Sequence, residues 1–203
     1  MVKVSVIIPT YNRFSCLLEA IESVTNQTMQ DLEIIVINDK SKQEEYYSFD
    51  FKKKYGDKVK IIHLEKNSTR LFGHASAGYV RTVGMKQAKG EYIAFLDDDD
   101  IWFPTKLEKQ IAAMNKTGCG MSSTEGLHGN KNQRYNINNK YPKFNKEKHF
   151  GCLVKIYKNK NIDISNKFPE VWNKKFIEIH NCMIASSVVV KKDILDKIGY
   201  MKN

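Results

Sequence analysis

Long apolar runs are missing from this chain of 203 residues. No stretch approaches the roughly 20 consecutive apolar residues that a membrane-spanning helix needs. The first residues lead directly into a strand-like run, 4–8, with no charged region followed by an apolar one, so no signal peptide is visible. These absences predict a cytoplasmic protein without a transmembrane segment.

Paired cysteines are missing as well. Cys16, Cys119, Cys152 and Cys182 lie far apart and form no Cys-x-x-Cys spacing, which disfavours a zinc site or a redox motif. We therefore expect free, buried thiols in a reducing compartment.

Arginine is rare, and the net charge of +10 comes mostly from lysines scattered along the chain. A basic surface attracts polyanions, but no compact basic block is present, so we expect no nucleic acid partner. Nucleotide-diphosphate substrates also suit a basic protein. Hydrophobic residues make up 41% of the chain, which is enough for the core of one domain.

Strand and helix patterns alternate along the chain. Apolar, β-branched runs typical of buried strands alternate with segments whose apolar residues recur on one helical face. The predicted strands are 4–8, 33–37, 59–64, 92–96 and 183–190; the predicted helices are 15–26 with Ser15 as N-cap, 43–55, 77–88, 104–114 and 193–198. This order predicts an α/β domain with a mostly parallel central sheet flanked by helices.

Two segments lack these patterns. Residues 65–76 are predicted to form an irregular loop. Residues 126–150 are rich in Asn, Lys, Gly and Tyr, which is typical of either a long loop acting as a mobile lid or plain surface disorder.

Three polar clusters directly follow predicted strands. They are Thr10-Tyr11-Asn12, Asn38-Asp39 and the four aspartates Asp97 to Asp100. In open, mostly parallel sheets, ligands bind at the carboxyl ends of the strands. We therefore expect the three clusters to share one rim of the sheet.

The four consecutive aspartates predict a metal site. Adjacent carboxylates repel one another unless a cation shares them. Successive residues of an extended chain point to opposite sides, so Asp97 and Asp99 are expected to face one way and Asp98 the other. Carboxylate oxygens suit Mg²⁺ or Mn²⁺, which in turn hold phosphate oxygens. A solvated acidic turn is the alternative.

The other two clusters suit a nucleoside. A carboxylate at Asp39 can accept hydrogen bonds from the amide or imide edge of a base. The ring of Tyr11 can stack on a base or a ribose. Each feature alone is equally typical of a helix cap or a surface tyrosine; their shared rim favours a binding role.

Three segments are recognisable sequence motifs: VSVIIPTYNR at 4–13, LEIIVIND at 32–39 and GEYIAFLDDDDIW at 90–102. In order and spacing they resemble the family 2 glycosyltransferases, which have the GT-A fold and transfer a sugar from a nucleotide-sugar donor with inversion. The resemblance is strong over about 2–114 and loose beyond. It implies one GT-A domain over 1–203, with a Rossmann-like nucleotide-sugar-binding half at 1–115 and a variable acceptor half at 116–203.

The resemblance implies roles for single residues. Thr10, Tyr11 and Asp39 would contact the nucleoside, usually uridine, and Pro9 and Arg13 would belong to the same donor-binding loop.

The run Asp97 to Asp99 resembles the family's Asp-x-Asp element. The resemblance implies Asp99, with Asp97, as the ligand of Mn²⁺ or Mg²⁺, and Asp97 or Asp98 on the ribose or beside the metal ligand. Arg81 would lie near the nucleotide at the start of a helix. Two positions depart from the family pattern, namely Asn38, where an acid is common, and Thr82, where asparagine is usual.

The expected general base is not evident. Inverting members use an Asp or Glu to deprotonate the acceptor hydroxyl, commonly in a Glu-Asp pair, and no such pair follows residue 150. Glu178 and His180 are the candidates within the chain. We favour a truncated chain over a base supplied from elsewhere or a chain that binds nucleotide sugar without transfer.

The resulting prediction is a metal-dependent transferase that uses a UDP-sugar, with a glycan, lipid or protein acceptor. A sugar nucleotidyltransferase needs a glycine-rich loop after the first strand, and residues 9–13 contain no glycine. A basic nucleic-acid-binding protein would be recognised by salt-sensitive binding.

Overall fold

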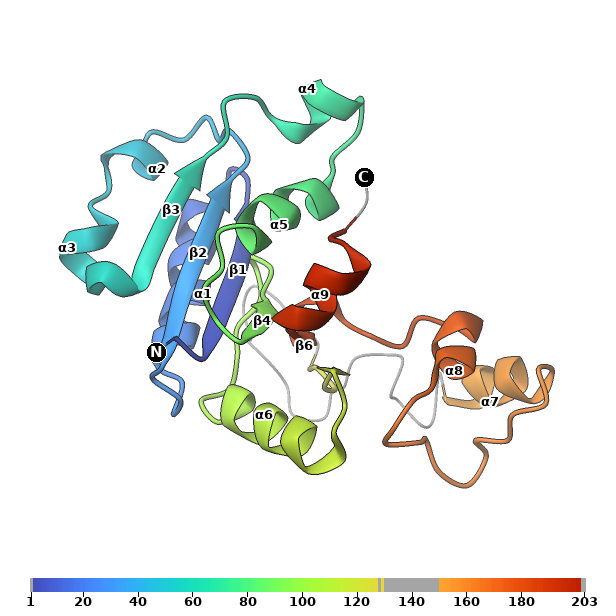
Figure 1. Cartoon of the computed structure of the whole chain (residues 1–203). Coiled ribbons are helices and arrows are strands. Elements are labelled where there is room, and N and C mark those ends of the chain that lie inside the picture. The colour runs from blue at the N-terminus through green and yellow to red at the C-terminus, as the bar shows by residue number, and fades with distance from the viewer. Residues whose placement is uncertain (1, 128, 130–149, 202–203) are drawn as a thin grey trace. The chain divides into compact units, whose positions relative to one another are not determined.

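The computed structural model describes residues 2–127, 129 and 150–201 (Figure 1). These residues form two compact units, one of Met1–Ser122 with Ala185–Asn203 and one of Ser123–Ile184. The first unit thus includes the last strand and helix of the predicted acceptor half. Most of the predicted lid or disordered segment, 126–150, lies outside the described residues.

A sheet forms the centre of the first unit. Among the described residues it has six strands in the order β3-β2-β1-β4-β6-β5. Four neighbouring strands are parallel: β3 (Val59–His63), β2 (Leu32–Asn38), β1 (Val4–Thr10) and β4 (Tyr92–Phe95). The short strands β6 (Val189–Lys191) and β5 (Met121–Ser122) pair antiparallel at the edge. The predicted α/β architecture with a mostly parallel sheet is confirmed.

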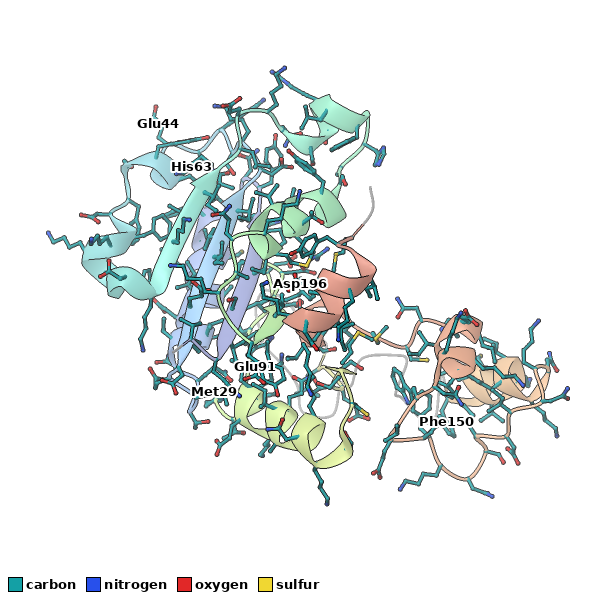
Figure 2. All side chains as sticks on the ribbon, viewed as in Figure 1. Met29, Glu44, His63, Glu91, Phe150 and Asp196 are labelled. Atoms are coloured by element: carbon teal, nitrogen blue, oxygen red, sulfur yellow. The ribbon has the colours of Figure 1, made fainter. Side chains whose placement is uncertain are left out.

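Helices cover both faces of the sheet because alternate strand residues point to opposite sides. Val6 and Ile8 pack with α1 (Phe14–Thr25) and α6 (Lys106–Thr117) in one apolar core. Ile7 and Ile35 pack in a second core with α5 (Ala77–Met85) and α9 (Lys192–Ile198). Figure 2 shows side chains of the first unit between the sheet and the helices that cover it.

The strand register determines which residues lie at the rim formed by the carboxyl ends of the strands. Thr10 is level with Asn38, and Asn38 is level with His63, so β1, β2 and β3 end side by side. Ile7 is level with Phe95 of β4, just before the four aspartates. The three polar clusters therefore follow the carboxyl ends of neighbouring strands, as predicted.

The prediction of one continuous helix over 43–55 is wrong, because the chain is not helical at Phe49. Two short helices, α2 (Glu45–Ser48) and α3 (Phe51–Tyr55), replace it, because Phe49 is extended with ψ 127°. Phe49 packs edge-on against Phe14 and Phe51 at ring distances of 5.4 and 4.9 Å. Asp50 then restarts the chain as an N-cap that accepts from the Lys53 N–H at 2.8 Å. Aromatic packing overrides the helical pattern here.

Other predicted boundaries also change. The predicted loop 65–76 contains α4 (Ser68–Phe72), which begins after the cap Asn67 and ends at left-handed Gly73. Helix α1 begins at Phe14, so Ser15 is not its N-cap. The predicted strand 183–190 is a 3-10 turn, Ala185–Ser187, followed by β6, because side chains bind the carbonyls of that turn. A further 3-10 turn, Gly56–Lys58, precedes β3.

The second unit has its own aromatic core. Its helices α7 (Gly151–Lys158) and α8 (Lys174–Ile179) bury Tyr157 and Phe176, whose rings stack at 4.2 Å. No helix in the described part of the chain is long and apolar enough to cross a membrane.

The cysteines are free thiols, as predicted, but their predicted burial holds only for Cys182. Cys16 and Cys152 are exposed, and Cys119 is half-buried. Cys16 occupies an outer position of α1, whose buried face is made by other residues.

Lys106 has a buried amine, and this burial predicts an effect on stability. Its Nζ is buried without a hydrogen-bond partner among the described residues and lies 3.8 Å from the centroid of the Trp102 ring. Burial lowers the pKa of Lys106 from its usual value to about 7, whereas the cation–π contact favours the charged form. In the unfolded chain the amine stays protonated to about pH 10.4.

We expect Lys106→Met to raise the free energy of unfolding at pH 7 by about 1–4 kcal/mol, because it removes a buried, unpaired charge. Between about pH 7 and 10 the unfolded wild-type chain binds more protons than the folded one, so wild-type stability rises and the difference shrinks. Denaturant unfolding at pH 7 and 9.5 measures this, with exposed Lys109→Met as the control. Parallel pH profiles for all three proteins would contradict the prediction.

Candidate functional site

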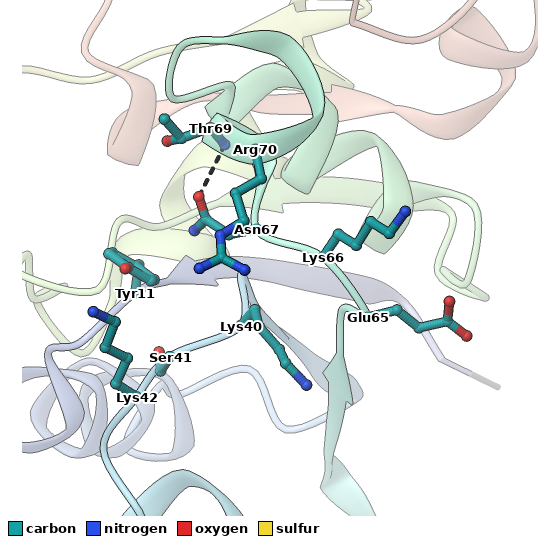
Figure 3. Close-up of a pocket in the computed structure, with 9 residues that line it drawn as sticks. All are labelled: Tyr11, Lys40, Ser41, Lys42, Glu65, Lys66, Asn67, Thr69 and Arg70. Atoms are coloured by element: carbon teal, nitrogen blue, oxygen red, sulfur yellow. Dashed lines mark hydrogen bonds between the residues drawn. The ribbon is translucent and has the colours of Figure 1, made fainter.

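A pocket of about 510 Å³ opens at the carboxyl ends of β1, β2 and β3 (Figure 3). Tyr11 comes from the loop after β1, and the remaining lining follows β2 and β3. Four of the lining side chains are basic, whereas one is acidic. The lining residues are Tyr11, Lys40, Ser41, Lys42, Glu65, Lys66, Asn67, Thr69 and Arg70. This cationic lining suits an anionic or acceptor-rich ligand.

Asn12 joins two walls of the pocket. It has a positive φ of 53°, a conformation that asparagine tolerates better than most residues. Its N–H donates to the Ser41 hydroxyl at 2.9 Å, and its side-chain oxygen accepts from the Lys42 N–H at 2.7 Å. The ring of Tyr11, 42% exposed, is consequently held at the pocket by a fixed loop.

Asp39 does not line the pocket. Its carboxylate accepts from the Ser68 N–H at 2.7 Å, from the Ser68 hydroxyl at 2.6 Å and from the Asn67 amide at 3.1 Å. Both carboxylate oxygens are thus engaged at the start of α4. The structure gives Asp39 a role in shaping the pocket wall, while its contact with a base stays a prediction.

Asn38, which departs from the family pattern, shapes the neighbouring turn. It is fully buried; its Oδ1 accepts from the Ser41 N–H at 2.8 Å, and its Nδ2 lies 3.0 Å from Nδ1 of His63. Burial, and secondarily Lys40, lowers the pKa of His63. A neutral imidazole can accept from the Asn38 amide at this position, whereas an acid would favour its charged form.

Two arginines form ion pairs with three of the four aspartates. Arg13 Nη1 lies 2.6 Å from Asp99 and 3.3 Å from Asp98, and Arg81 forms an ion pair with Asp97. Burial raises the pKa of Asp98, although hydrogen bonds from Thr10 and the Tyr11 backbone and the charge of Arg13 lower it. The loop after β1 is therefore tied directly to the aspartates.

The exposures of the aspartates alternate, but the side chains do not face as predicted from an extended chain. The run folds into a turn, in which Asp98 and Asp99 both contact Arg13 and Asp97 contacts Arg81. The side chain of Asp98 is 7% exposed, whereas Asp97 and Asp99 are 33% and 51% exposed. Among the residues that the structure describes, no group of three or more His, Cys, Asp or Glu side chains converges on a metal position. One or two open carboxylates still fit Mg²⁺ or Mn²⁺, because such ions commonly complete their coordination with phosphate oxygens and water.

Ser186 was not predicted from the sequence. Its hydroxyl donates to Asp100 at 2.5 Å and accepts from the Asp97 N–H at 3.0 Å. In the sequence it appears only as one residue of an apolar strand-like run, and nothing marks it as a partner of Asp100, 86 positions away, and of Asp97, 89 positions away.

Three further residues were predicted for the site: Pro9, Glu178 and His180. Pro9 is a β1 residue level with Ile37. Glu178 forms an exposed pair with Lys174 at 3.5 Å, and the His180 carbonyl lies 3.4 Å from the Tyr157 hydroxyl. Both base candidates belong to the second unit and are described only within it.

A family model described as Glycosyl transferase family 2 matches residues 5–189. The chain belongs to this family. The resemblance predicted from the strand-end motifs is thereby confirmed.

An uncharacterized glycosyltransferase of Rickettsia bellii is 44% identical over 122 residues, which cover 60% of this chain and 16% of that protein. Across the curated relatives, the match covers 16–45% of their own lengths. This glycosyltransferase chain therefore spans less than half the length of those relatives.

Solved structures show the same fold. The crystal structure of S. aureus TarS 1-349 in complex with UDP has a TM-score of 0.63 at 19% identity, covering 96% of this chain and 48% of that chain. The mannosyltransferase PcManGT from Pyrobaculum calidifontis, in complex with GDP-Man and Mn²⁺, has a TM-score of 0.66 at 14% identity, covering 98% and 47%. These likenesses confirm the GT-A-type architecture.

The contacts of Asp39 predict a structural effect without any ligand. We expect Asp39→Ala to lower the free energy of unfolding by about 2–3 kcal/mol, because buried donors at the start of α4 lose a charged acceptor. Denaturant unfolding of the ligand-free protein measures this. Asp57→Ala is the control, since that side chain is 90% exposed in a surface ion pair. Equal losses in the two variants would show that Asp39 does not hold α4.

Proposed function

We propose that this family 2 chain transfers a sugar from a UDP-sugar to an acceptor hydroxyl, with inversion and with a divalent metal ion. The observation that carries the proposal is the loop after β1. Tyr11 in this loop lines the cationic pocket, and Arg13, two residues later, reaches Asp98 and Asp99. One short loop thus joins a place for a nucleoside to a place for a metal-bound diphosphate.

The pocket lining favours a base rich in hydrogen-bond acceptors. Lys40, Lys42, Lys66 and Arg70 supply donors only. Uracil presents two carbonyl acceptors on either side of one N–H, so it suits this lining. The UDP in the TarS structure supports this choice, whereas the GDP-Man in the mannosyltransferase structure makes guanine the alternative to test.

Arg81 supports a diphosphate beside the acidic run. Its Nε is buried without a hydrogen-bond partner among the described residues, while its Nη2 pairs with Asp97. An unsatisfied buried donor is costly, and a guanidinium that turns away from Asp97 would satisfy it with a phosphate oxygen. Arg81 and Arg13 are therefore proposed to hold the donor phosphates.

The metal ion is proposed to be Mn²⁺ or Mg²⁺, held by Asp99 with Asp97. When bound, such an ion stabilises the charge that develops on the leaving diphosphate. Mn²⁺ in the mannosyltransferase structure supports this assignment. The arginines that neutralise the aspartates would then turn toward the phosphates.

Transfer to an acceptor also needs a catalytic base. Inversion requires a base on the face of the sugar opposite the diphosphate, which takes the proton of the acceptor hydroxyl as its oxygen attacks the anomeric carbon. Glu178 and His180 remain candidates for this base. A chain that binds the nucleotide sugar without transferring it is the second proposal, since it needs only the rim of the first unit.

Titration calorimetry with UDP tests the metal ligand. We expect Mn²⁺ to strengthen UDP binding to the wild type, and Asp99→Asn to weaken the Mn²⁺-dependent binding at least tenfold, because a neutral amide is a poor ligand for a hard cation. Asp57→Asn, on the exposed surface, should bind as the wild type does. UDP binding that is equal with Mn²⁺ and with a chelator would refute metal dependence.

Competition among UDP, GDP and CDP tests the base. We expect UDP to bind best and Arg70→Ala to weaken it about tenfold, as for the loss of one charged hydrogen bond of about 1.5 kcal/mol. Lys58→Ala, which removes a surface lysine paired with Gln30, is the control. Preference for GDP would overturn the uridine assignment, and a thermal shift with an oligonucleotide but not with UDP would favour a nucleic-acid-binding protein.

A further inference from the structure

Ser186 contacts both ends of the acidic run with one hydroxyl group. The hydroxyl accepts from the Asp97 N–H at 3.0 Å and donates to the Asp100 carboxylate at 2.5 Å. The run itself is folded into a turn, because the Asp100 N–H donates to the Asp97 carbonyl at 3.1 Å. The serine therefore closes a turn whose two central residues are Asp98 and Asp99.

Hydrogen bonds to the backbone carbonyls of residues 186–188 fix the position of this hydroxyl. The Trp102 indole N–H donates to the Ser186 carbonyl at 2.7 Å, and the Gln110 amide donates to the Ser187 carbonyl at 2.8 Å. The Phe95 N–H donates to the Val188 carbonyl at 3.1 Å, which attaches the same segment to β4. Ser186 is 7% exposed and so has little freedom to move.

We propose that Ser186 is a positioning residue that holds the Asp97–Asp100 turn in the shape that presents Asp99 to the metal ion. This inference rests on the proposed function. The arginines cannot do this in the loaded site, because a cation on Asp97 and Asp99 competes with Arg13 and Arg81 for the same oxygens. A neutral hydroxyl directed at Asp100 does not compete with the cation.

The test compares four proteins: the wild type, Ser186→Ala, Ser186→Thr and Ser187→Ala. Mn²⁺-dependent UDP affinity is measured by calorimetry, and metal-free uridine affinity is measured in parallel. We expect Ser186→Ala to weaken Mn²⁺-dependent UDP binding by about tenfold or more, the size typical for a group that supports a metal ligand. We expect uridine binding to change less than twofold, because the base pocket is formed by other residues.

The other variants separate positioning from folding. Ser186→Thr keeps the hydroxyl and is expected to restore most of the Mn²⁺-dependent affinity. Ser187→Ala removes a hydroxyl from the same buried turn, keeps the carbonyl bonded to Gln110, and should bind as the wild type does. If Ser186→Ala does not fold, Trp102→Phe, which removes the donor to the Ser186 carbonyl, should show a smaller loss in the same direction.

Failure of the inference is distinct from failure of the proposed function. A wild type whose UDP binding ignores Mn²⁺ overturns the proposed metal-dependent function and the inference with it. A wild type with Mn²⁺-dependent binding, matched by Ser186→Ala within twofold, overturns only the role of Ser186. Equal losses in Ser186→Ala and Ser187→Ala would also overturn it, since the effect would then belong to the turn as a whole.

Discussion

Strand β1 is hydrogen-bonded in parallel to β2 on one side and to β4 on the other. Because this register is fixed on both sides, the loops that follow the three strands meet at one edge. The other end of the strand is fixed as well. Glu33 accepts from the Ser5 hydroxyl at 2.6 Å and from the Lys89 N–H at 2.7 Å, and a Cβ at Gly90 would lie 2.5 Å from the Ser5 nitrogen. The chain must enter β4 in close contact with β1. The start of β4 is thereby fixed relative to β1, and so is the acidic run that follows β4.

The charge of the acidic run is the second constraint. Four carboxylates at the end of a buried strand repel one another, and the fold supplies two positive charges from separate elements. Arg13 comes from the loop before α1, and Arg81 comes from the middle of α5 rather than from the helix start expected from the resemblance. Each arginine is brought to the run by a helix that packs on a different face of the sheet. Packing of the two cores thus determines the electrostatics of the rim.

The sequence predicts the parts of this arrangement that depend on local patterns. The strands and the polar residues that follow them are predicted by the buried apolar runs and by the family motifs, whereas the turn at Asp97 to Asp100 is not. Contacts between distant segments were not predicted. The partners of Asp39 are Asn67 and Ser68, and the partner of Asp100 is Ser186, because these pairs form only when the sheet is assembled. The break at Phe49 likewise depends on rings contributed by another helix, α1.

Strands β5 and β6 lie side by side, with Ser122 level with Val189. The second unit, Ser123–Ile184, is inserted in the sequence between β5 and β6. Its two ends are consequently held together by the sheet, and the entropy of closing the intervening chain grows only slowly with its length. The inserted segment can therefore change in length or sequence while the paired strands and the rim of the sheet keep their register. A chimaera joined at these two strands would inherit the rim from one parent and the inserted segment from another.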